Sequence, residues 1–367
     1  MVNFHKNSKI FAVFLFVIKF LWIFIYLNMK FKNILKIIFF RIILITMVVC
    51  LVVILPAVYF SIKTNINNNQ NINMQVLEIW NIDSFEGGSG SKSSFLSNAT
   101  IDFEKQNKGT YFMVKNMSEQ ECEIAISQGQ YPAMFSYGTA IGKSLRDYLK
   151  KIDNKYNVNA QILETGKIDS DVYAVGWCQS RYVYISSQEV VGDNKIADIA
   201  LSRGFVTTNK KGKQKITYSV AFGEKINHPS KLLNYNNEPY AYDENNVNKT
   251  AYNAYCDFVE GKSQILLGTI RDYLRIENRV NLGKWSGAVY EPADGYCDLV
   301  QYVSVCKLTN QAEICEKFIN YLLSASVQTK LANICMLPCT DNLKIYENGV
   351  MNEIENAVVQ KYQDVFN

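Results

Sequence analysis

The densest group of side chains that could do chemistry lies in residues 81–91, with the sequence NIDSFEGGSGS. Asp83 and Glu86 carry carboxylates that can accept hydrogen bonds, and Phe85 between them offers an aromatic face. The glycines precede an apolar pattern of helical spacing, so backbone N–H groups of this loop could face a polar ligand. The loop lacks a glycine followed directly by Lys-Ser or Lys-Thr, and it lacks G-x-G-x-x-G spacing. The loop is therefore expected to contact a polar ligand, and it does not match the sequence motifs of nucleotide-binding sites.

Metal and nucleophile chemistry is disfavoured by the cysteines and histidines. Eight cysteines follow residue 63, none of them in a C-x-x-C motif, and His228 is the only histidine in that part. Zinc sites need a closer grouping of such ligands, so the sequence predicts no metal and no cofactor. A Ser-His or Cys-His nucleophile would have to use His228, which precedes a proline in an expected loop. Disulfide pairing stays open, because only Cys335 and Cys339 lie close in sequence.

The charge is divided between a basic leader and an acidic body. The 367 residues carry 38 Lys and Arg against 34 Asp and Glu, a formal net charge of +4. Residues 1–63 hold eight of the positive charges and no acid, which leaves 30 positive and 34 negative side chains in residues 64–367. A phosphate-backbone binder needs clustered positive charge on its folded part, so the charge disfavours nucleic-acid binding, and we expect no nucleic-acid partner.

An apolar run in the leader predicts a membrane anchor. Residues 42–60 contain no charged side chain and approach the roughly 20 residues that span a bilayer. Basic residues between 30 and 41 place that side in the cytoplasm and the body outside. No A-x-A-like cleavage site follows, so we expect an uncleaved signal anchor at the cell membrane, with translation starting at Met29. Residues 64–74 are an Asn-rich polar tether.

The apolar pattern beyond the tether alternates between strand and helix. Strands are predicted at 76–80, 111–115 and 133–137, and helices at 95–103, 118–127 and 141–152. Ser118 and Glu121 form a capping box that begins the second helix. This order predicts an α/β fold with a parallel sheet covered on both faces. Ligands bind beyond the carboxyl ends of such strands, which places loops 81–91, 116–119 and 138–142 on one rim.

The second half of the chain predicts another α/β domain. Strands are expected at 172–177, 181–186, 264–267 and 298–306, and helices at 251–259, 314–322 and 327–334. Residues 207–215 are typical of a solvated hairpin turn, and residues 227–250 lack periodicity and are expected to form loops.

Five segments, taken in order, resemble a known family. They are VLEIWNIDSFEGGSGSKSSFL (76–96), ISQGQYPAMFSYGTAIG (126–142), FVEGKSQILLGTIRDYLRIENRV (258–280), EPADGYCDLVQYVSV (291–305) and FINYLLSASVQTKL (318–331). The set is similar to the extracellular solute-binding proteins of ABC importers, in the carbohydrate-binding branch found in Gram-positive bacteria. The chain departs from the pattern at Ser263 and Ile265, where Ala and Met are usual, and at Gly176, where Pro is frequent.

The resemblance implies a two-lobe fold of the periplasmic-binding-protein type II class, with a hinge crossed three times. Lobe one would comprise 75–177 and 286–330, and lobe two 178–285 and 331–367. The implied function is the capture of a carbohydrate between the lobes and its delivery to ABC permease subunits in the membrane. The resemblance implies a monomer with no catalysis of its own.

The resemblance also implies the ligand-binding residues. Carboxylates and an arginine would hydrogen-bond sugar hydroxyls, while aromatic rings would stack on the sugar. The candidates are Asp83, Phe85, Glu86, Tyr137, Thr139, Arg271, Trp285 and Tyr296.

Structural interpretations compete with several of these assignments. Trp80 ends a buried strand and is expected in the core, and Trp285 near a lobe junction fits packing as well as stacking. Asp83 could bond only to amides of its own loop, and Arg271 with Asp272 could form an internal salt bridge.

Two other functions stay open. One is a sensor that presents solute to a signalling partner, and the other is a membrane-tethered glycan-processing enzyme with a carboxylate pair.

Overall fold

The computed structural model describes residues 41–42, 75–152, 155–201, 206–208, 214–216, 218–220 and 250–367. Residues 74–367 form one compact unit that contains both sheets and the sites discussed below. The expected anchor at 42–60 (beyond Ile42), the tether, Met29, His228 and the expected loops at 227–249 lie outside the described residues. Within the described ranges, no helix combines the length and the apolar character that a membrane span requires.

A mixed sheet of six strands forms the first lobe, in the order β14-β6-β13-β3-β1-β2. The strands are β1 (Gln75–Ile82), β2 (Thr110–Met117), β3 (Met134–Gly138), β6 (Val175–Gln179), β13 (Val300–Val305) and β14 (Leu337–Pro338). β1 pairs in parallel with β2 and β3, whereas β13 runs antiparallel to β3 and β6. The predicted parallel sheet is therefore present in its first three strands, and later segments of the chain add antiparallel strands.

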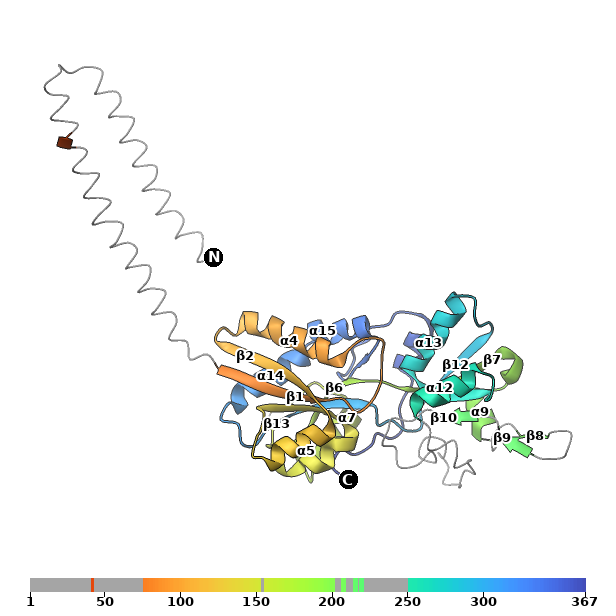
Figure 1. Ribbon diagram of the computed structural model, residues 1–367, viewed down its shortest axis with the longest axis horizontal. Helices are drawn as coiled ribbons and strands as arrows, with labels where there is room; N and C mark the ends of the chain where they lie inside the picture. Colours follow the sequence, from red (N-terminus) through yellow and green to blue (C-terminus); the bar gives the residue numbers. More distant parts are fainter. Residues whose placement is uncertain are drawn as a thin grey trace, which may run out of the picture. The chain divides into compact units, whose positions relative to one another are not determined.

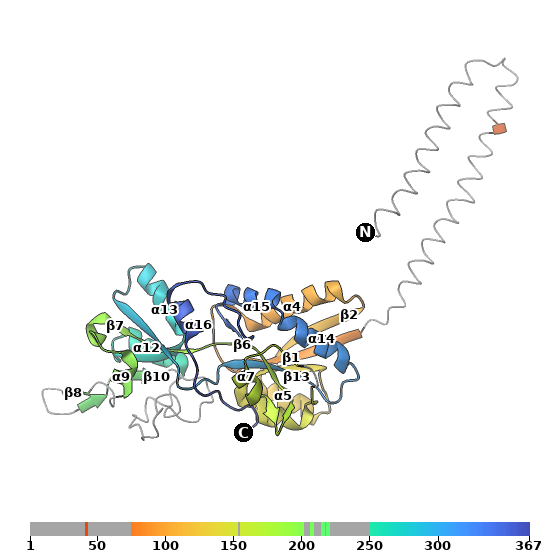
Figure 2. The ribbon, with the colours of Figure 1, turned by 180° about the vertical axis from the view of Figure 1, so that it is seen from behind.

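Helices cover both faces of this sheet (Figures 1 and 2). One face carries α4 (Lys92–Gln106), α14 (Ala312–Leu322) and α15 (Ala325–Gln328), followed by the 3-10 helix η4 (Thr329–Ile334). The other carries α5 (Glu119–Ser127) and α7 (Ala160–Thr165). The predicted capping box begins α5, since Ser118 and Glu121 bond to each other's backbone N–H. Trp80 is 1% exposed and meets Phe135 edge to face, which confirms that it belongs to the core.

The helix predicted at 141–152 is wrong in form, although its apolar positions are buried. The segment contains η2 (Thr139–Ile141), α6 (Gly142–Leu145) and η3 (Arg146–Tyr148). Leu149 and Ile152 then form isolated bridges to Cys306 and Val172. Because these bridges direct backbone hydrogen bonds to neighbouring segments, the chain cannot continue as a helix there. The spacing of the apolar residues in 141–152 predicted that they are buried, but it did not predict that Leu149 and Ile152 pair with other segments of the chain.

A second sheet forms the other lobe, in the order β10-β11-β7-β12. Its strands are β7 (Tyr182–Ser187), β10 (Tyr218–Val220), β11 (Ile265–Thr269) and β12 (Ala288–Ala293). The helices of this part are α8 (Gln188–Val191), α9 (Ile196–Leu201), α12 (Ala251–Val259), α13 (Ile270–Asn281) and α16 (Gly349–Asn356). Two separate ladders pair β4 (Lys167–Ile168) with β5 (Asp171–Val172), and β8 (Val206–Thr208) with β9 (Gln214–Ile216). The second ladder fits the predicted hairpin, whose turn lies outside the described residues.

The chain passes between the two lobes at Ser180–Arg181, at 294–299 and at 339–348. The C-terminal tail then returns to the first lobe, where the Val365 N–H donates to the Thr165 carbonyl. This return is a fourth passage, so the expected hinge of three crossings is wrong in number. The lobe boundaries in the structure therefore differ from the predicted ones. β12 pairs with β7 along its length and so belongs to the second lobe, although 286–330 was assigned to the first. Of the segment 331–367, α16 packs on the second sheet, whereas β14 pairs with β6 of the first.

A buried amide ties the parts of the first lobe together near these passages. Gln328 is fully buried, and its Nε2 donates to the carbonyls of Trp177 and Leu322 at 2.8 and 3.0 Å. Its Oε1 accepts from the backbone N–H of Cys339 at 3.1 Å. One side chain thus satisfies backbone groups from β6, α14 and the end of β14.

Replacing Gln328 by Ala should lower the free energy of unfolding by about 2–4 kcal/mol, because buried backbone groups lose their partner. Gln161 is exposed in the first turn of α7, so Gln161→Ala is the matched control and should change stability by less than about 0.5 kcal/mol. Urea unfolding followed by tryptophan fluorescence measures both. Equal midpoints for the two variants would show that the Gln328 amide is dispensable.

Candidate functional site

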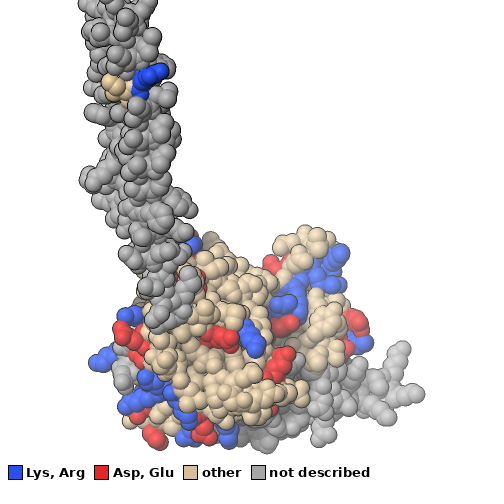
Figure 3. All heavy atoms as spheres, turned by 60° about the vertical axis from the view of Figure 1, so that its left-hand side comes forward, with Lys and Arg blue, Asp and Glu red and all other residues tan. Residues whose placement is uncertain are grey.

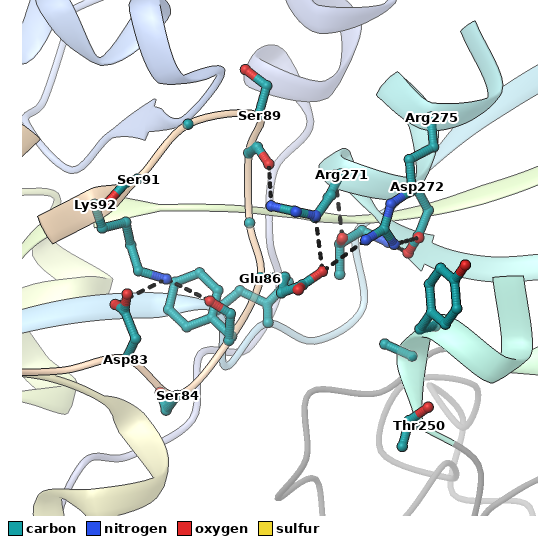
Figure 4. A pocket seen from close by; sticks show the side chains of 18 residues that line it. Asp83, Ser84, Glu86, Ser89, Ser91, Lys92, Thr250, Arg271, Asp272 and Arg275 are labelled. Atoms are coloured by element: carbon teal, nitrogen blue, oxygen red, sulfur yellow. Dashed lines mark hydrogen bonds and ion pairs between the residues drawn. The ribbon is translucent and has the colours of Figure 1, made fainter. Parts of the chain in front are cut away.

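A cavity of about 630 Å³ lies between the two lobes. The first lobe contributes the loop 83–92, and the second contributes the starts of α12 and α13. Most of the wall is polar or charged (Figure 4). Besides the loop, the lining residues are Thr250, Ala251, Tyr252, Thr269, Arg271, Asp272, Arg275 and Leu299.

The glycines of the loop allow it to pack closely on the segment 334–336. A Cβ atom at Gly88 would lie 2.0 Å from the carbonyl oxygen of Ile334, and one at Gly90 would lie 2.5 Å from Cγ2 of the same residue. The Ser89 N–H donates to the Ile334 carbonyl at 3.0 Å. Close backbone packing therefore explains the glycines, for which the sequence had suggested ligand contact.

Glu86 reaches from this loop across the cavity to α13. Its Oε2 lies 2.9 Å from Nε of Arg271 and 3.1 Å from a terminal nitrogen of Arg275. Arg271 also donates to the carbonyl of Gly88 at 3.4 Å. Figure 4 shows the three charged side chains pointing toward one another. Since they come from different lobes, these contacts hold the lobes together on the cavity side.

Asp272 positions one of the two arginines, Arg275. It is 1% exposed, its Oδ2 accepts from the Thr269 N–H at 3.0 Å, and its Oδ1 accepts from Arg275 at 2.9 Å. Burial raises the pKa of Asp272, and the Thr269 N–H and Arg275 oppose that rise. The sequence had suggested an Arg271–Asp272 salt bridge, but adjacent helix residues do not face each other. The partner of Asp272 is instead Arg275, three residues on.

Lys92 holds the other end of the loop. It is 6% exposed, and its Nζ donates to the Phe85 carbonyl at 2.5 Å and lies 3.5 Å from Oδ1 of Asp83. The same nitrogen lies 3.6 Å from the centre of the Phe85 ring. Asp83 and Phe85 both line the cavity as predicted, but Lys92 covers one face of the Phe85 ring. The sequence analysis did not single out Lys92.

Tyr252 is the exposed aromatic side chain of the second-lobe wall. It is 59% exposed, its ring stacks on Tyr255 at 6.1 Å, and the Arg275 guanidinium lies 5.6 Å from its centre. The sequence analysis predicted this helix at 251–259 and did not single out Tyr252. The available signal was an aromatic side chain in the first turn of the helix.

Tyr137 and Thr139, predicted as ligand contacts, do not line the cavity. Tyr137 is fully buried, with its hydroxyl 2.8 Å from that of Ser304. Thr139 donates to the carbonyl of Asp298 at 2.7 Å. The structure therefore places both in packing positions of the first lobe.

Trp285 and Tyr296 also lie away from the cavity. Trp285 stacks on Phe258 at 5.0 Å in the core of the second lobe. Tyr296 is 5% exposed and donates to Oε1 of Gln363 at 2.5 Å. Of the eight predicted residues, the cavity brings together Asp83, Phe85, Glu86 and Arg271.

In the described part of the chain, no group of three or more His, Cys, Asp or Glu side chains is placed so that it could hold a metal ion. The eight cysteines there are free thiols. Burial raises the pKa of Cys297 to about 11, so this thiol is in its unreactive protonated form at neutral pH.

Comparison by sequence gives no relative: no family model matches the chain, and no curated protein matches it.

Solved structures, in contrast, share its fold. The sugar-binding protein MalE of Xanthomonas citri superposes with a TM-score of 0.57 at 14% identity, over 79% of this chain and 86% of that one. An extracellular solute-binding protein of Staphylococcus aureus gives 0.55 at 14% identity, over 79% and 87%. A putative oligosaccharide periplasmic-binding protein of Synechococcus gives 0.56 at 11% identity, over 79% and 88%. The expected two-lobe α/β fold is thereby confirmed.

Gly88→Ala should destabilise the protein by about 1–3 kcal/mol, because the new Cβ forces the loop away from Ile334. Ser89→Ala in the same loop adds no atom and should cost less than about 0.5 kcal/mol. Thermal unfolding measured by circular dichroism compares the two. A Gly88→Ala variant as stable as Ser89→Ala would mean that the loop is not held closely in solution.

Proposed function

We propose that this protein is the extracellular substrate-binding component of an ABC transporter, which captures a carbohydrate between its lobes and delivers it to a membrane permease. The observation that carries the proposal is the cavity of about 630 Å³ lined from both lobes by hydrogen-bonding side chains and an open tyrosine. Its volume falls within the range of about 300–1,000 Å³ typical of small-molecule sites.

The chemistry of the wall suits a sugar. Sugar rings present C–H faces that pack on aromatic rings, and Tyr252 offers such a ring at 59% exposure. Sugar hydroxyls need directional donors and acceptors, which Asp83 and Arg271 supply around the same space. The wall therefore combines a stacking surface with fixed polar partners.

In a two-lobe fold, ligand binding can change the arrangement of the lobes. A ligand that contacts both lobes favours the closed arrangement by its differential affinity for it. Closure about a hinge is an established class of transition for such folds. The passages at Ser180–Arg181, 294–299 and 339–348 are the segments that would bend.

The structural neighbours support this choice of ligand. The Staphylococcus aureus protein was solved in complex with maltose, and the Xanthomonas citri protein is described as sugar-binding. The identities of 14% leave the sugar bound by the present chain open to experiment.

The proposal includes a place in the cell. The apolar run 42–60 with basic residues before it supports an anchor that leaves residues beyond 60 outside. A tethered binding protein suits a Gram-positive cell, where a free one would diffuse away. We expect a monomer that meets its permease at the membrane.

Calorimetry of the full chain in lipid nanodiscs, which avoid sugar-headed detergents, tests capture against a panel of mono- and oligosaccharides. At least one sugar should bind saturably. Tyr252→Ala should weaken that binding by about 10-fold, since the stacking contact contributes about 1–1.5 kcal/mol. Tyr111→Ala is the matched control, because Tyr111 is 42% exposed on β2 and does not line the cavity. A panel without saturable binding would refute carbohydrate capture.

A further inference from the structure

The second-lobe wall presents two arginines that share one carboxylate. Arg271 and Arg275 lie four residues apart, one turn of α13, and both contact the same Oε2 of Glu86. Their side chains are 35% and 24% exposed, so both remain open to the cavity. Glu86 is 58% exposed on a loop of the other lobe. It is therefore the partner that can leave without unfolding either lobe.

Three helix starts add positive potential to the same space. The first residues of α4, α12 and α13 all line the cavity or adjoin it. The first turns of α4 and α12 contain no acid, and the acid of α13, Asp272, is buried against Thr269 and Arg275. A helix start carries roughly half a positive charge, so these ends reinforce the arginines.

Glu86 shows which ligand group fits between the arginines. Its carboxylate forms an ion pair of 2.9 Å with Nε of Arg271, and it accepts a hydrogen bond of 3.1 Å from Arg275. Resting on the proposed capture of a carbohydrate, we infer that the ligand is an acidic sugar of the uronate type, whose carboxylate replaces that of Glu86 between Arg271 and Arg275. Its ring then lies toward Tyr252, beside Arg275.

An exchange of carboxylates explains why an acidic sugar is preferred to a neutral one. When a uronate displaces Glu86, both guanidiniums keep an anionic partner, and Glu86 returns to water from a site where it was already 58% exposed. A neutral sugar that displaced Glu86 would leave Arg271 without a counter-charge and Arg275 with Asp272 alone, which is costly in a partly enclosed site. The neutral sugar would otherwise have to bind beside the intact ion pairs, in a smaller space.

Calorimetry of the full chain in nanodiscs with digalacturonate and its methyl ester tests the role of the charge, because the ester keeps the sugar rings, removes the charge and adds only a methyl group. The ester should bind at least about 10-fold more weakly. Arg271→Gln should weaken digalacturonate by about 10-fold and narrow the difference between acid and ester. Arg275→Gln provides a second variant of the same pair. Lys143→Gln, an exposed residue on α6 with the same charge change, should leave binding unchanged.

The Glu86→Gln variant is expected to change the affinity for digalacturonate in the opposite direction from the arginine variants. It removes the competing carboxylate and leaves both arginines for the ligand, so digalacturonate should bind several-fold more tightly. If Glu86 instead holds sugar hydroxyls, the same variant should weaken binding of any sugar. Circular dichroism confirms that each variant is folded before its affinity is compared.

The outcomes separate this inference from the proposed function. Neutral oligosaccharides that bind as well as digalacturonate would overturn the uronate assignment and leave carbohydrate capture standing. If sugar phosphates bind more tightly than uronates, the two arginines recognise a phosphate and the uronate assignment is wrong. A chain that binds no saccharide of any class would refute both.

Discussion

The packing of a glycine-rich loop against a later segment of the chain is the constraint on which the ligand cavity depends. Gly88 and Gly90 let the loop approach Ile334 more closely than any larger residue would, and the Ser89 N–H bonds to the Ile334 carbonyl. Ser180, at the first passage between lobes, donates its hydroxyl to the Gly87 carbonyl at 2.7 Å. The loop is thus held by the hinge region itself, and this fixes the point from which Glu86 extends.

Charge in the cavity is balanced by pairs that span its wall, without an excess of either sign. Lys92 forms an ion pair with Asp83, and Arg271 and Arg275 both form ion pairs with Glu86. Arg275 also pairs with Asp272. The wider surface follows the same pattern, because acidic and basic side chains lie interspersed on the face shown in Figure 3. Contacts of this kind can be exchanged for ligand contacts at little cost, which suits a protein that must bind and then release.

The passages between lobes show how the chain keeps buried polar groups satisfied where it leaves each sheet. Arg181 is 6% exposed and donates to Oε1 of Gln179, to the Ser180 carbonyl and to the hydroxyl of Tyr362 from the returning tail. The C-terminal tail therefore completes the hinge region. The family resemblance implied that this tail belongs to the second lobe, whereas the tail contacts the first lobe through Val365.

The sequence by itself determined the order of strands and helices from 76 to 137 and many of the side chains that fill the core, because burial imposes a period on apolar residues that can be read locally. It did not predict β12 or α13. The strand predicted at 76–80, which lies within β1, and the capping box of Ser118 needed no tertiary information. The loop residues Asp83 and Glu86 were likewise identified by their type and place after a strand. Only the tertiary structure decided that Glu86 meets α13 and that Tyr137 faces the core. These contacts join positions more than 150 residues apart, and no local pattern specifies which distant side chain will lie opposite.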